Sequence, residues 1–397
     1  MDRRTFSRMT GVSVLGIASG CLDVKLVEQP KVLPMPRLLP GPQVLGNGVA
    51  SVAISQWPSG ADAAVIISAD DLCPLDLGGD YDFGGSWSNV PASGIVTNQV
   101  EAFVLNLLDT YPLIRFSFNT VTAMRFDPRT NERLQRSYSL SGAGEWLLRL
   151  REIQESRPGF VLGLHGYSHY DAIHGGPGEF KGYDPISARV VLDRMEAEVR
   201  ESRLRFTRGF RPPGWALTGP LIEELATRRY VLGDNSRLPT YTGVRPSYIR
   251  TAAGNWLFRI GVTFELSPEQ TFAQGGLFEA HHHLTPPNVN TLTDPAIRDR
   301  LGRFLERWYH SSDPLLAWLS ADEVFGAYCD AAAIQWIASL DGMKVTIAVL
   351  NPEALKPGIT WVTTSNQVND IEILVAGVKL GLNVRQRTGV LTASLTA

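Results

Sequence analysis

The sequence predicts an α/β protein in which a parallel sheet, open or closed into a barrel, is followed by a small β unit. Two observations support this. From about residue 61 to 334, short apolar runs alternate with amphipathic helical stretches, the pattern of parallel strands joined by crossover helices. From 335 to 397, short β-type runs are separated by turn signals such as Asp341-Gly342 and Pro357-Gly358, which predicts a small antiparallel β domain packed on the main one.

The elements of the α/β part follow from this alternation. Strands are expected at 63–69, 113–118, 159–164, 207–210, 230–233, 256–264, 276–280 and 315–319. Helices are expected at 95–109, 143–155, 186–204, 219–228, 294–309 and 320–333. The helix from 186 has the strongest signal, because Val190, Val191, Met195 and Val199 form an apolar stripe between charged neighbours.

Two segments precede the sheet. Residues 1–21 resemble an export signal with a twin-arginine run at Arg3-Arg4 and a lipoprotein cleavage box that ends at Cys21. We therefore expect an exported protein, periplasmic or on the cell envelope, that meets the membrane only through a lipid on Cys21. The alternative is a basic tail with a chance cysteine. Residues 22–60 are rich in Pro and Gly and are expected to be an extended linker.

Composition narrows the classes of function. The chain has 397 residues, of which 44 % are hydrophobic and 19 % charged, so it can bury a sizeable core. Its net charge of -3 gives no electrostatic case for binding nucleic acid. Beyond the N-terminus there is no apolar run of the ~18 residues that a membrane span needs.

Two of the polar motifs suggest a metal site. Asp70-Asp71 ends the first apolar run, at the strand end where parallel α/β folds form their sites. His165 and His169 follow another apolar run, and a helical turn would place both imidazoles on one side. Two imidazoles and a carboxylate can hold a divalent metal and leave positions open for water and substrate. Separately, the two motifs could be a capped turn and a polar loop.

Two further motifs follow later strands. The segment Arg211-Pro212-Pro213-Gly214-Trp215 is a rigid loop whose arginine can hold a carboxylate and whose Trp215 offers a flat face to a sugar. In the run from His281 to His283, strand alternation places the first and third histidines on one side and His282 on the other. A histidine facing the site could protonate a leaving group or act as a further metal ligand. The alternative for the arginine loop is a structural turn with a buried tryptophan, and the alternative for the histidine run is a chance repeat without function.

In this order, the four motifs resemble those of the polysaccharide deacetylase family, carbohydrate esterase family four, over about residues 61–330. The resemblance implies a distorted (β/α) barrel of about seven strands. It implies that Asp71, His165 and His169 bind a divalent metal, usually zinc, and that Asp70 is the catalytic base. It also implies that Arg211 orients Asp70 and that the late histidine is the general acid, with His281 and His283 both open as candidates.

Three departures distinguish this chain from the family pattern. The first motif reads Ser-Ala-Asp-Asp-Leu, the second reads His-Gly-Tyr-Ser-His, and the late motif is a triple histidine. An unusual insert from Cys73 to Val90 follows the first motif and could form a wall of the cleft. Candidate substrate-binding residues are Trp87, Tyr167, Tyr170, Pro213 and Trp215.

The sequence thus predicts metal-dependent hydrolysis of N-acetyl or O-acetyl groups on a cell-envelope or extracellular polysaccharide. Two alternatives remain: a glycoside-processing hydrolase, and a non-catalytic polysaccharide-binding envelope lipoprotein.

Overall fold

The computed structural model describes residues 35–73, 99–126, 133–170, 178–235, 245–262, 266–284, 290–387 and 389–396. The expected export signal with Cys21, and Trp87 with most of its insert, lie outside these residues. Leu33–Ala397 form one compact unit. Among the described residues, no helix is both long and apolar enough to cross a membrane.

The main domain is built on a curled sheet whose central strands are parallel. The order of the main path is β10-β11-β9-β8-β7-β4-β3-β12, and β13 pairs with the first residues of β3. Only β10 at the edge is antiparallel to its neighbour. The strands are β3 (Ala63–Leu72), β4 (Phe116–Thr120), β7 (Phe160–Leu164), β8 (Phe206–Phe210), β9 (Val231–Asn235), β10 (Ser247–Arg250), β11 (Trp256–Val262), β12 (Leu277–His283) and β13 (Leu316–Trp318).

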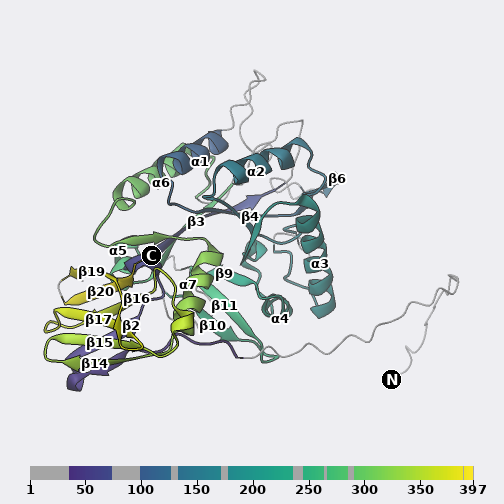
Figure 1. The fold of residues 1–397 in the computed structure, drawn as a ribbon. Helices are drawn as coiled ribbons and strands as arrows, with labels where there is room; N and C mark the ends of the chain where they lie inside the picture. The colour runs from purple at the N-terminus through teal and green to yellow at the C-terminus, as the bar shows by residue number, and fades with distance from the viewer. Residues whose placement is uncertain are drawn as a thin grey trace, which may run out of the picture. The chain divides into compact units, whose positions relative to one another are not determined.

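Helices lie on the outside of this sheet (Figure 1). They are α1 (Gln99–Thr110), α2 (Glu145–Ser156), α3 (Pro185–Ser202), α4 (Gly219–Thr227), α5 (Pro268–Ala273), α6 (Pro295–Trp308) and α7 (Ala321–Ala333). Several begin at side-chain caps: Asp184 caps α3, Asp294 caps α6, and Ser320 with Glu323 forms a capping box on α7. Each strand and helix expected between 61 and 334 overlaps an observed element. The hairpin β5 (Ala123–Phe126) and β6 (Arg133–Ser139), strand β10 and helix α5 were not expected.

The sheet curls far enough to bring distant strands together, as a barrel requires. Arg211, just beyond β8, contacts Glu279 of β12, although three strands separate β8 from β12 in the sheet order. A cavity of about 30 Å³ lies inside the curl, lined by residues of β3, β4, β8, β9, β11 and β12. The chain therefore has the predicted α/β fold, a distorted (β/α) barrel with seven parallel strands along the main path of the described part.

The C-terminal residues form a β-sandwich, with two strands from before the barrel. Its five-stranded sheet runs β1-β2-β16-β20-β19 and is antiparallel; its four-stranded sheet runs β14-β15-β17-β18, and there β15 and β17 are parallel. Trp361 lies fully buried between the sheets. The strands are β1 (Gln43–Leu45), β2 (Ala50–Ile54), β14 (Trp336–Asp341), β15 (Lys344–Val349), β16 (Thr360–Thr364), β17 (Asp370–Val375), β18 (Val378–Lys379), β19 (Leu382–Arg387) and β20 (Val390–Leu395).

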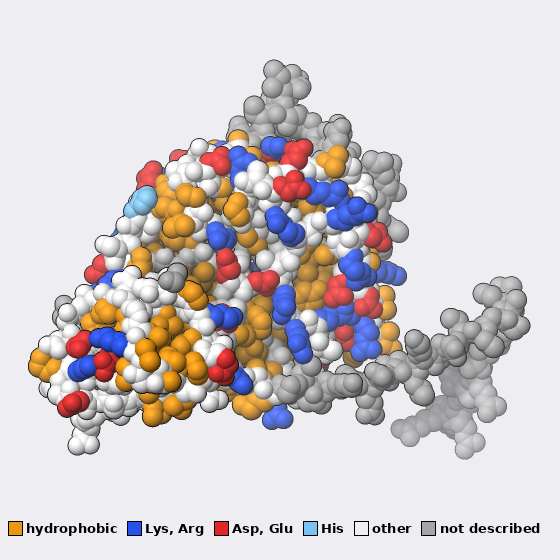
Figure 2. All heavy atoms as spheres, viewed as in Figure 1, with side chains coloured by type: hydrophobic (Ala, Val, Ile, Leu, Met, Phe, Trp, Pro, Cys, Tyr) orange, Lys and Arg blue, Asp and Glu red, His pale blue; other side chains and the backbone are white. Residues whose placement is uncertain are grey.

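Strands β1 and β2 correct the expected extended linker over 22–60 for its described residues, from 35 on. The parallel pair of β15 and β17 corrects the all-antiparallel expectation. In β2 buried and half-buried residues alternate, so its apolar side chains complete the sandwich core. Figure 1 shows this early strand among the late strands of the chain. Figure 2 shows hydrophobic side chains gathered over the sandwich, while basic and acidic side chains are intermixed over the helices.

The sandwich packs directly on the barrel. Asp62, next to β3, forms ion pairs with Arg385 at 2.6 Å and Arg387 at 2.8 Å. It also accepts a 2.8 Å hydrogen bond from the backbone N–H of Leu315. Helix α7 contributes to both cores, through Val324 on the barrel side and Ala331 on the sandwich side. The strand that carries the aspartate pair is therefore anchored at its start by the sandwich.

Candidate metal centre

The aspartate pair stands on a bulge at the end of β3. Its pairing with β4 shifts between Ala69 and Leu72, so that Asp70 and Asp71 together face one residue of β4. Asp71 has a φ of +73°, a left-handed conformation that Asp adopts more readily than most residues. In a regular strand the two side chains would point to opposite faces. The bulge instead lets both carboxylates point to the same cluster of histidines.

Asp71 lies between the two histidines of the second motif. Its Oδ1 is 3.5 Å from Nε2 of His165 and 3.3 Å from Nε2 of His169. The three ligand atoms lie within 4.8 Å of one another. Asp71 and His165 are buried, whereas the His169 side chain is 24 % exposed. Two imidazoles and one carboxylate, open on one side, fit the divalent ion that the resemblance implies.

The charges of this group suit metal binding. Burial alone would raise the pKa of Asp71, but His165 and His169 hold it well below its usual range. Burial lowers the pKa of His169 to about 4, against the attraction of Asp71. Burial also acts against the charged form of His165, yet Asp70 and Asp71 raise its pKa overall. Asp71 is thus ionised and His169 neutral near pH 7, the protonation states in which these two side chains bind a metal ion.

A buried glutamate, not identified from the sequence, holds the loop between the two histidines. Glu179 accepts hydrogen bonds from the backbone N–H of Tyr167 at 2.7 Å and of Ser168 at 2.8 Å. It also accepts one of 2.7 Å from the Ser168 hydroxyl. Burial raises the pKa of Glu179 to about 7, although these hydrogen bonds favour its charged form. The glutamate thereby satisfies backbone donors that the tight loop leaves inside the protein.

Gly166 lets this loop pass close to its neighbours. Its φ is +80°, and a Cβ there would meet the Glu179 carboxylate and, at 2.7 Å, Cγ of Pro213. Only glycine avoids both the backbone strain and these contacts. Gly166 therefore allows the close packing of the second motif on Glu179 and on the Arg-Pro-Pro loop.

Asp70 lies in a more crowded setting than Asp71. Its Oδ1 accepts a 2.7 Å hydrogen bond from the Asn119 amide and lies 3.9 Å from Nε of Arg211. Its Oδ2 is 3.9 Å from Nε2 of His165 and 3.6 Å from Nε2 of His281. Burial alone would raise the pKa of Asp70, but His165, His281 and Arg211 lower it overall. Asp70 is therefore an ionised carboxylate with one oxygen facing the histidines.

A second glutamate not identified from the sequence, Glu279, contacts two residues near Asp70. Glu279, whose side chain is 2 % exposed, contacts the Arg211 guanidinium and lies 2.5 Å from the Ser68 hydroxyl. The Ser68 oxygen is 3.1 Å from Nδ1 of His281. A carboxylate only accepts, so Ser68 donates to Glu279 and accepts from the Nδ1–H of His281. The His281 Nε2 atom then carries the lone pair and faces Asp70.

The triple histidine divides as strand alternation predicts. The rings of His281 and His283 are 4.8 Å apart, and with Asp70 they form a second group of three whose ligand atoms lie within 4.8 Å of one another. His282 lies outside this group and lines a cavity of about 370 Å³ with Leu301 and Phe304 of helix α6, a cavity that His281 also lines. Among the described residues, His281 and His283 thus belong to a group of metal-ligating side chains, and His282 does not.

The expected substrate-binding residues have different positions. Trp215 lies in the site: the Arg211 guanidinium is 4.9 Å from its ring, and the His281 ring is 5.6 Å away. Pro213 is buried and lies against Gly166 of the second motif, and Tyr167 and Tyr170 are half-buried. The structure therefore places Trp215, of the described aromatic candidates, directly against the histidine cluster.

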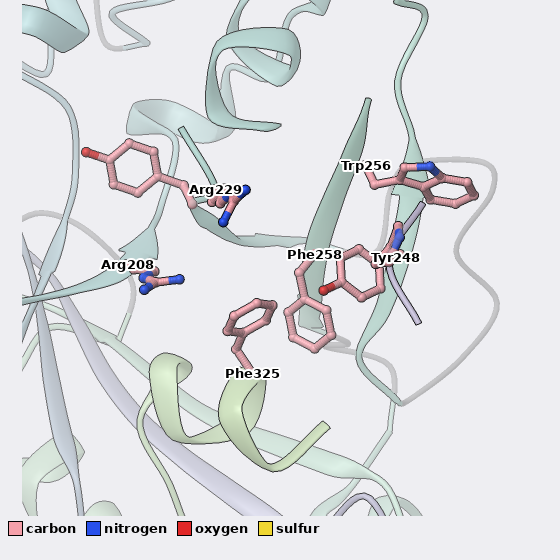
Figure 3. A pocket seen from close by; sticks show the side chains of 8 residues that line it. Arg208, Arg229, Tyr248, Trp256, Phe258 and Phe325 are labelled. Carbon is pink, nitrogen blue, oxygen red and sulfur yellow. The ribbon is translucent and has the colours of Figure 1, made fainter. Parts of the chain in front are cut away.

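A separate cavity of about 280 Å³ lies at the opposite end of the barrel, where β8 and β11 begin (Figure 3). Its labelled lining residues are Arg208, Arg229, Tyr248, Trp256, Phe258 and Phe325. The lining contains no histidine or carboxylate among the described residues. Within the described part of the chain, both groups of side chains that could hold a metal lie at the other end of the strands.

The chain was compared with known protein families, curated proteins and solved structures. No protein-family model matches the chain, and no match was found among curated proteins. A solved structure of a candidate polysaccharide deacetylase from Mycobacterium smegmatis is 15 % identical over 70 % of this chain and 93 % of that chain, with a TM-score of 0.43. A family 4 acetyl xylan esterase from Clostridium thermocellum, in complex with a cobalt ion, is 15 % identical over 66 % and 90 %, with a TM-score of 0.33. The chitin deacetylase from Colletotrichum lindemuthianum is 11 % identical over 57 % and 87 %, with a TM-score of 0.28. By their names, these are two deacetylases and an acetyl esterase.

Proposed function

We propose that this protein is a metal-dependent hydrolase that removes acetyl groups from a cell-envelope or extracellular polysaccharide. The observation that carries the proposal is the group of Asp71, His165 and His169, with a second ionised carboxylate, Asp70, beside it. Asp71, His165 and His169 would hold a divalent ion, with zinc as the first candidate for this ligand set. When bound, such an ion polarises a carbonyl oxygen and lowers the pKa of a water molecule.

The proton path is assigned to residues around Asp70. Asp70 takes a proton from the attacking water, which adds to the acetyl carbonyl carbon. His281, 3.6 Å from Asp70, receives that proton and delivers it to the departing amine or hydroxyl as the bond to the acetyl carbon breaks. The pKa of His281 is well below its usual value because of burial, so the ring starts neutral and can accept the proton. His283 is the alternative donor.

Positioning of these groups is assigned to their neighbours. Asn119 and Arg211 hold Asp70 on its Oδ1 side, and Ser68 with Glu279 holds His281 by its Nδ1 atom. Trp215 offers an aromatic face next to His281 for a sugar ring. Tyr167, Tyr170 and Trp87 remain proposals as further sugar contacts.

Hydrolysis of acetyl groups is favoured over the two alternatives. A glycosidase needs two carboxylates on opposite sides of the glycosidic bond, whereas Asp70 and Asp71 are neighbours on one strand that face the same histidines. A non-catalytic binding protein has no need for an ionised Asp70 held beside the metal ligands.

Export, lipidation at Cys21 and a periplasmic or envelope location are part of the same proposal. Incorporation of labelled fatty acid into the wild-type protein, but not into Cys21→Ser, would test the anchor.

The assay for function is acetate release from acetylated polysaccharides by the purified protein. Chitin oligomers, peptidoglycan fragments and acetyl xylan cover amide and ester substrates. We expect acetate from at least one of them, no release after chelation, and recovery on adding zinc. Release of reducing sugar ends without acetate would indicate a glycosidase, and binding without either product would indicate a binding protein.

A further inference from the structure

A second group of metal-ligating side chains lies beside the first. It consists of Asp70, His281 and His283, whose ligand atoms lie within 4.8 Å of one another. We propose that this group is a second divalent-metal site, weaker than the first, and that its occupancy inhibits hydrolysis. The inference rests on the proposed function, because inhibition requires Asp70 and His281 to be the proton-transfer groups.

The orientation of His281 is that of a metal ligand. Its Nδ1–H is held by Ser68, which is held in turn by Glu279, and its Nε2 faces Asp70 at 3.6 Å. His165 in the first group has the same arrangement: a fixed Nδ1–H, and an Nε2 that is 3.5 Å from Asp71. Metal-binding histidines are held by this kind of outer hydrogen bond, which fixes the tautomer. Each group thus has one buried histidine whose Nε2 lone pair faces a carboxylate.

The third ligand comes from the triple-histidine sequence. His283 follows His281 on the same face of β12, with the two rings 4.8 Å apart. His283 is half-buried, while Asp70 and His281 are buried. The group is therefore open on the His283 side, where an ion from solution could enter.

Two features make the second site weaker than the first. The Arg211 guanidinium, 3.9 Å from Asp70, repels a cation there. An ion already held by Asp71 would also repel a second one, since Asp70 Oδ2 lies only 3.9 Å from Nε2 of His165. Once bound, the second ion occupies the lone pairs of Asp70 and His281. Asp70 can then no longer take the proton from water, and His281 can no longer carry it to the leaving group.

The experiment measures metal binding first and activity second. Metal-free full-length protein is titrated with Zn²⁺ by calorimetry and by equilibrium dialysis with elemental analysis. We expect two ions per chain for the wild type, the second bound at least about tenfold more weakly. His283→Gln should bind only the tight ion, and the matched control His282→Gln, on the opposite face of β12, should bind two. Acetate release by the wild type should rise with the first equivalent and fall as the second binds.

Several results would overturn the proposal. These are a wild type that binds a single ion, a His283→Gln variant that still binds two, or activity that rises with the second equivalent. His169→Ala separates this inference from the proposed function. If His169→Ala loses the tight ion while His283→Gln has no effect on binding, only the second site is wrong. If the wild type binds no ion, the proposed function fails as well.

Discussion

The Nδ1 atom of His165 donates a 2.8 Å hydrogen bond to the backbone carbonyl oxygen of Arg211. A carbonyl can only accept, so this contact fixes the tautomer of His165 and leaves its Nε2 lone pair directed at Asp71. It also joins the histidine motif to the Arg-Pro-Pro motif, which directly follows β8, the next strand of the barrel. The backbone of one motif thereby prepares a side chain of the other for metal binding.

The first prediction concerns the metal ligands. His169→Ala should lose the tightly bound ion, because it removes one of three ligands, while the free energy of unfolding of the metal-free protein should change by less than about 1 kcal/mol, since the side chain is partly exposed. Elemental analysis and thermal unfolding check the two parts. His310→Ala, which removes an exposed histidine, is the control and should keep its ion. Full occupancy in His169→Ala would show that the ligands are elsewhere.

The second prediction separates the two aspartates. Asp70→Asn should keep the tight ion but lose turnover by ~10²-fold or more, because an amide cannot accept the proton. Asp71→Asn should lose both, and its fold should survive because Asn also tolerates the left-handed φ of +73° at this position. Metal content and kcat are the measurements. Equal loss of metal in the two variants would mean that the roles are shared or reversed.

The third prediction concerns the close packing at Gly166. Gly166→Ala should destabilise the protein by about 2–4 kcal/mol, from left-handed backbone strain and the clash with Glu179 and Pro213. Gly377→Ala is a matched control, since Gly377 has the same φ of +80° with nothing within 4 Å of its Cβ position. Gly377→Ala should lower the free energy of unfolding by only about 1–2 kcal/mol. Chemical denaturation of both variants gives the difference, and equal losses would show that the clash is absent.

The fourth prediction is a pH dependence that arises from Glu179. Its pKa is about 7 in the folded protein, against a usual value near 4.5. Between these values the folded state holds a proton that the unfolded state has lost, so this group makes stability fall as pH rises. The slope is at most about 1.4 kcal/mol per pH unit. The Glu179→Gln variant has no titrating group at this position, and its other groups titrate as in the wild type. Between pH 5 and 7, its free energy of unfolding should therefore fall less than that of the metal-free wild type. Parallel curves for the two proteins would contradict this.

The fifth prediction concerns the contact between sandwich and barrel. Asp62→Ala leaves Arg385 and Arg387 without their shared carboxylate and should lower the free energy of unfolding by about 1–3 kcal/mol. Asp330→Ala breaks the more exposed pair with Lys356 and should cost no more than about 0.5–1 kcal/mol. Denaturant unfolding measures both. If Asp62→Ala is no more destabilising than its control, the ion pairs do not hold the two parts together.

Much of the barrel could be predicted because its signals are local. The strands are short apolar runs, and helices such as α3 and α6 have apolar stripes and capped starts. The sandwich was harder, because its five-stranded sheet pairs β2 with β16, about 300 residues later. Nothing local shows such a pairing, and the prolines around β1 and β2 favoured the linker interpretation.

The candidate site was predicted in part for the same reason. The sequence placed Asp70-Asp71, and His165 with His169, directly after two apolar runs, and the structure has them at the carboxyl ends of β3 and β7, which β4 separates. The bulge that turns Asp71 into the cluster depends on pairing with β4 and leaves no sequence signal. Glu179 is a lone acid ten residues beyond His169, and only the fold shows its role. Glu279 could have been found, because it precedes His281 by two positions and so shares its face of β12.

The most direct test of metal-dependent deacetylation is acetate release by metal-free protein as one equivalent of Zn²⁺ is added. The test substrate is the acetylated polysaccharide that the untreated protein hydrolyses fastest. We predict no release above background from the metal-free wild type, and full recovery near one equivalent. His169→Ala should not recover under the same conditions. Equal acetate release by the metal-free and zinc-loaded wild type would contradict the account.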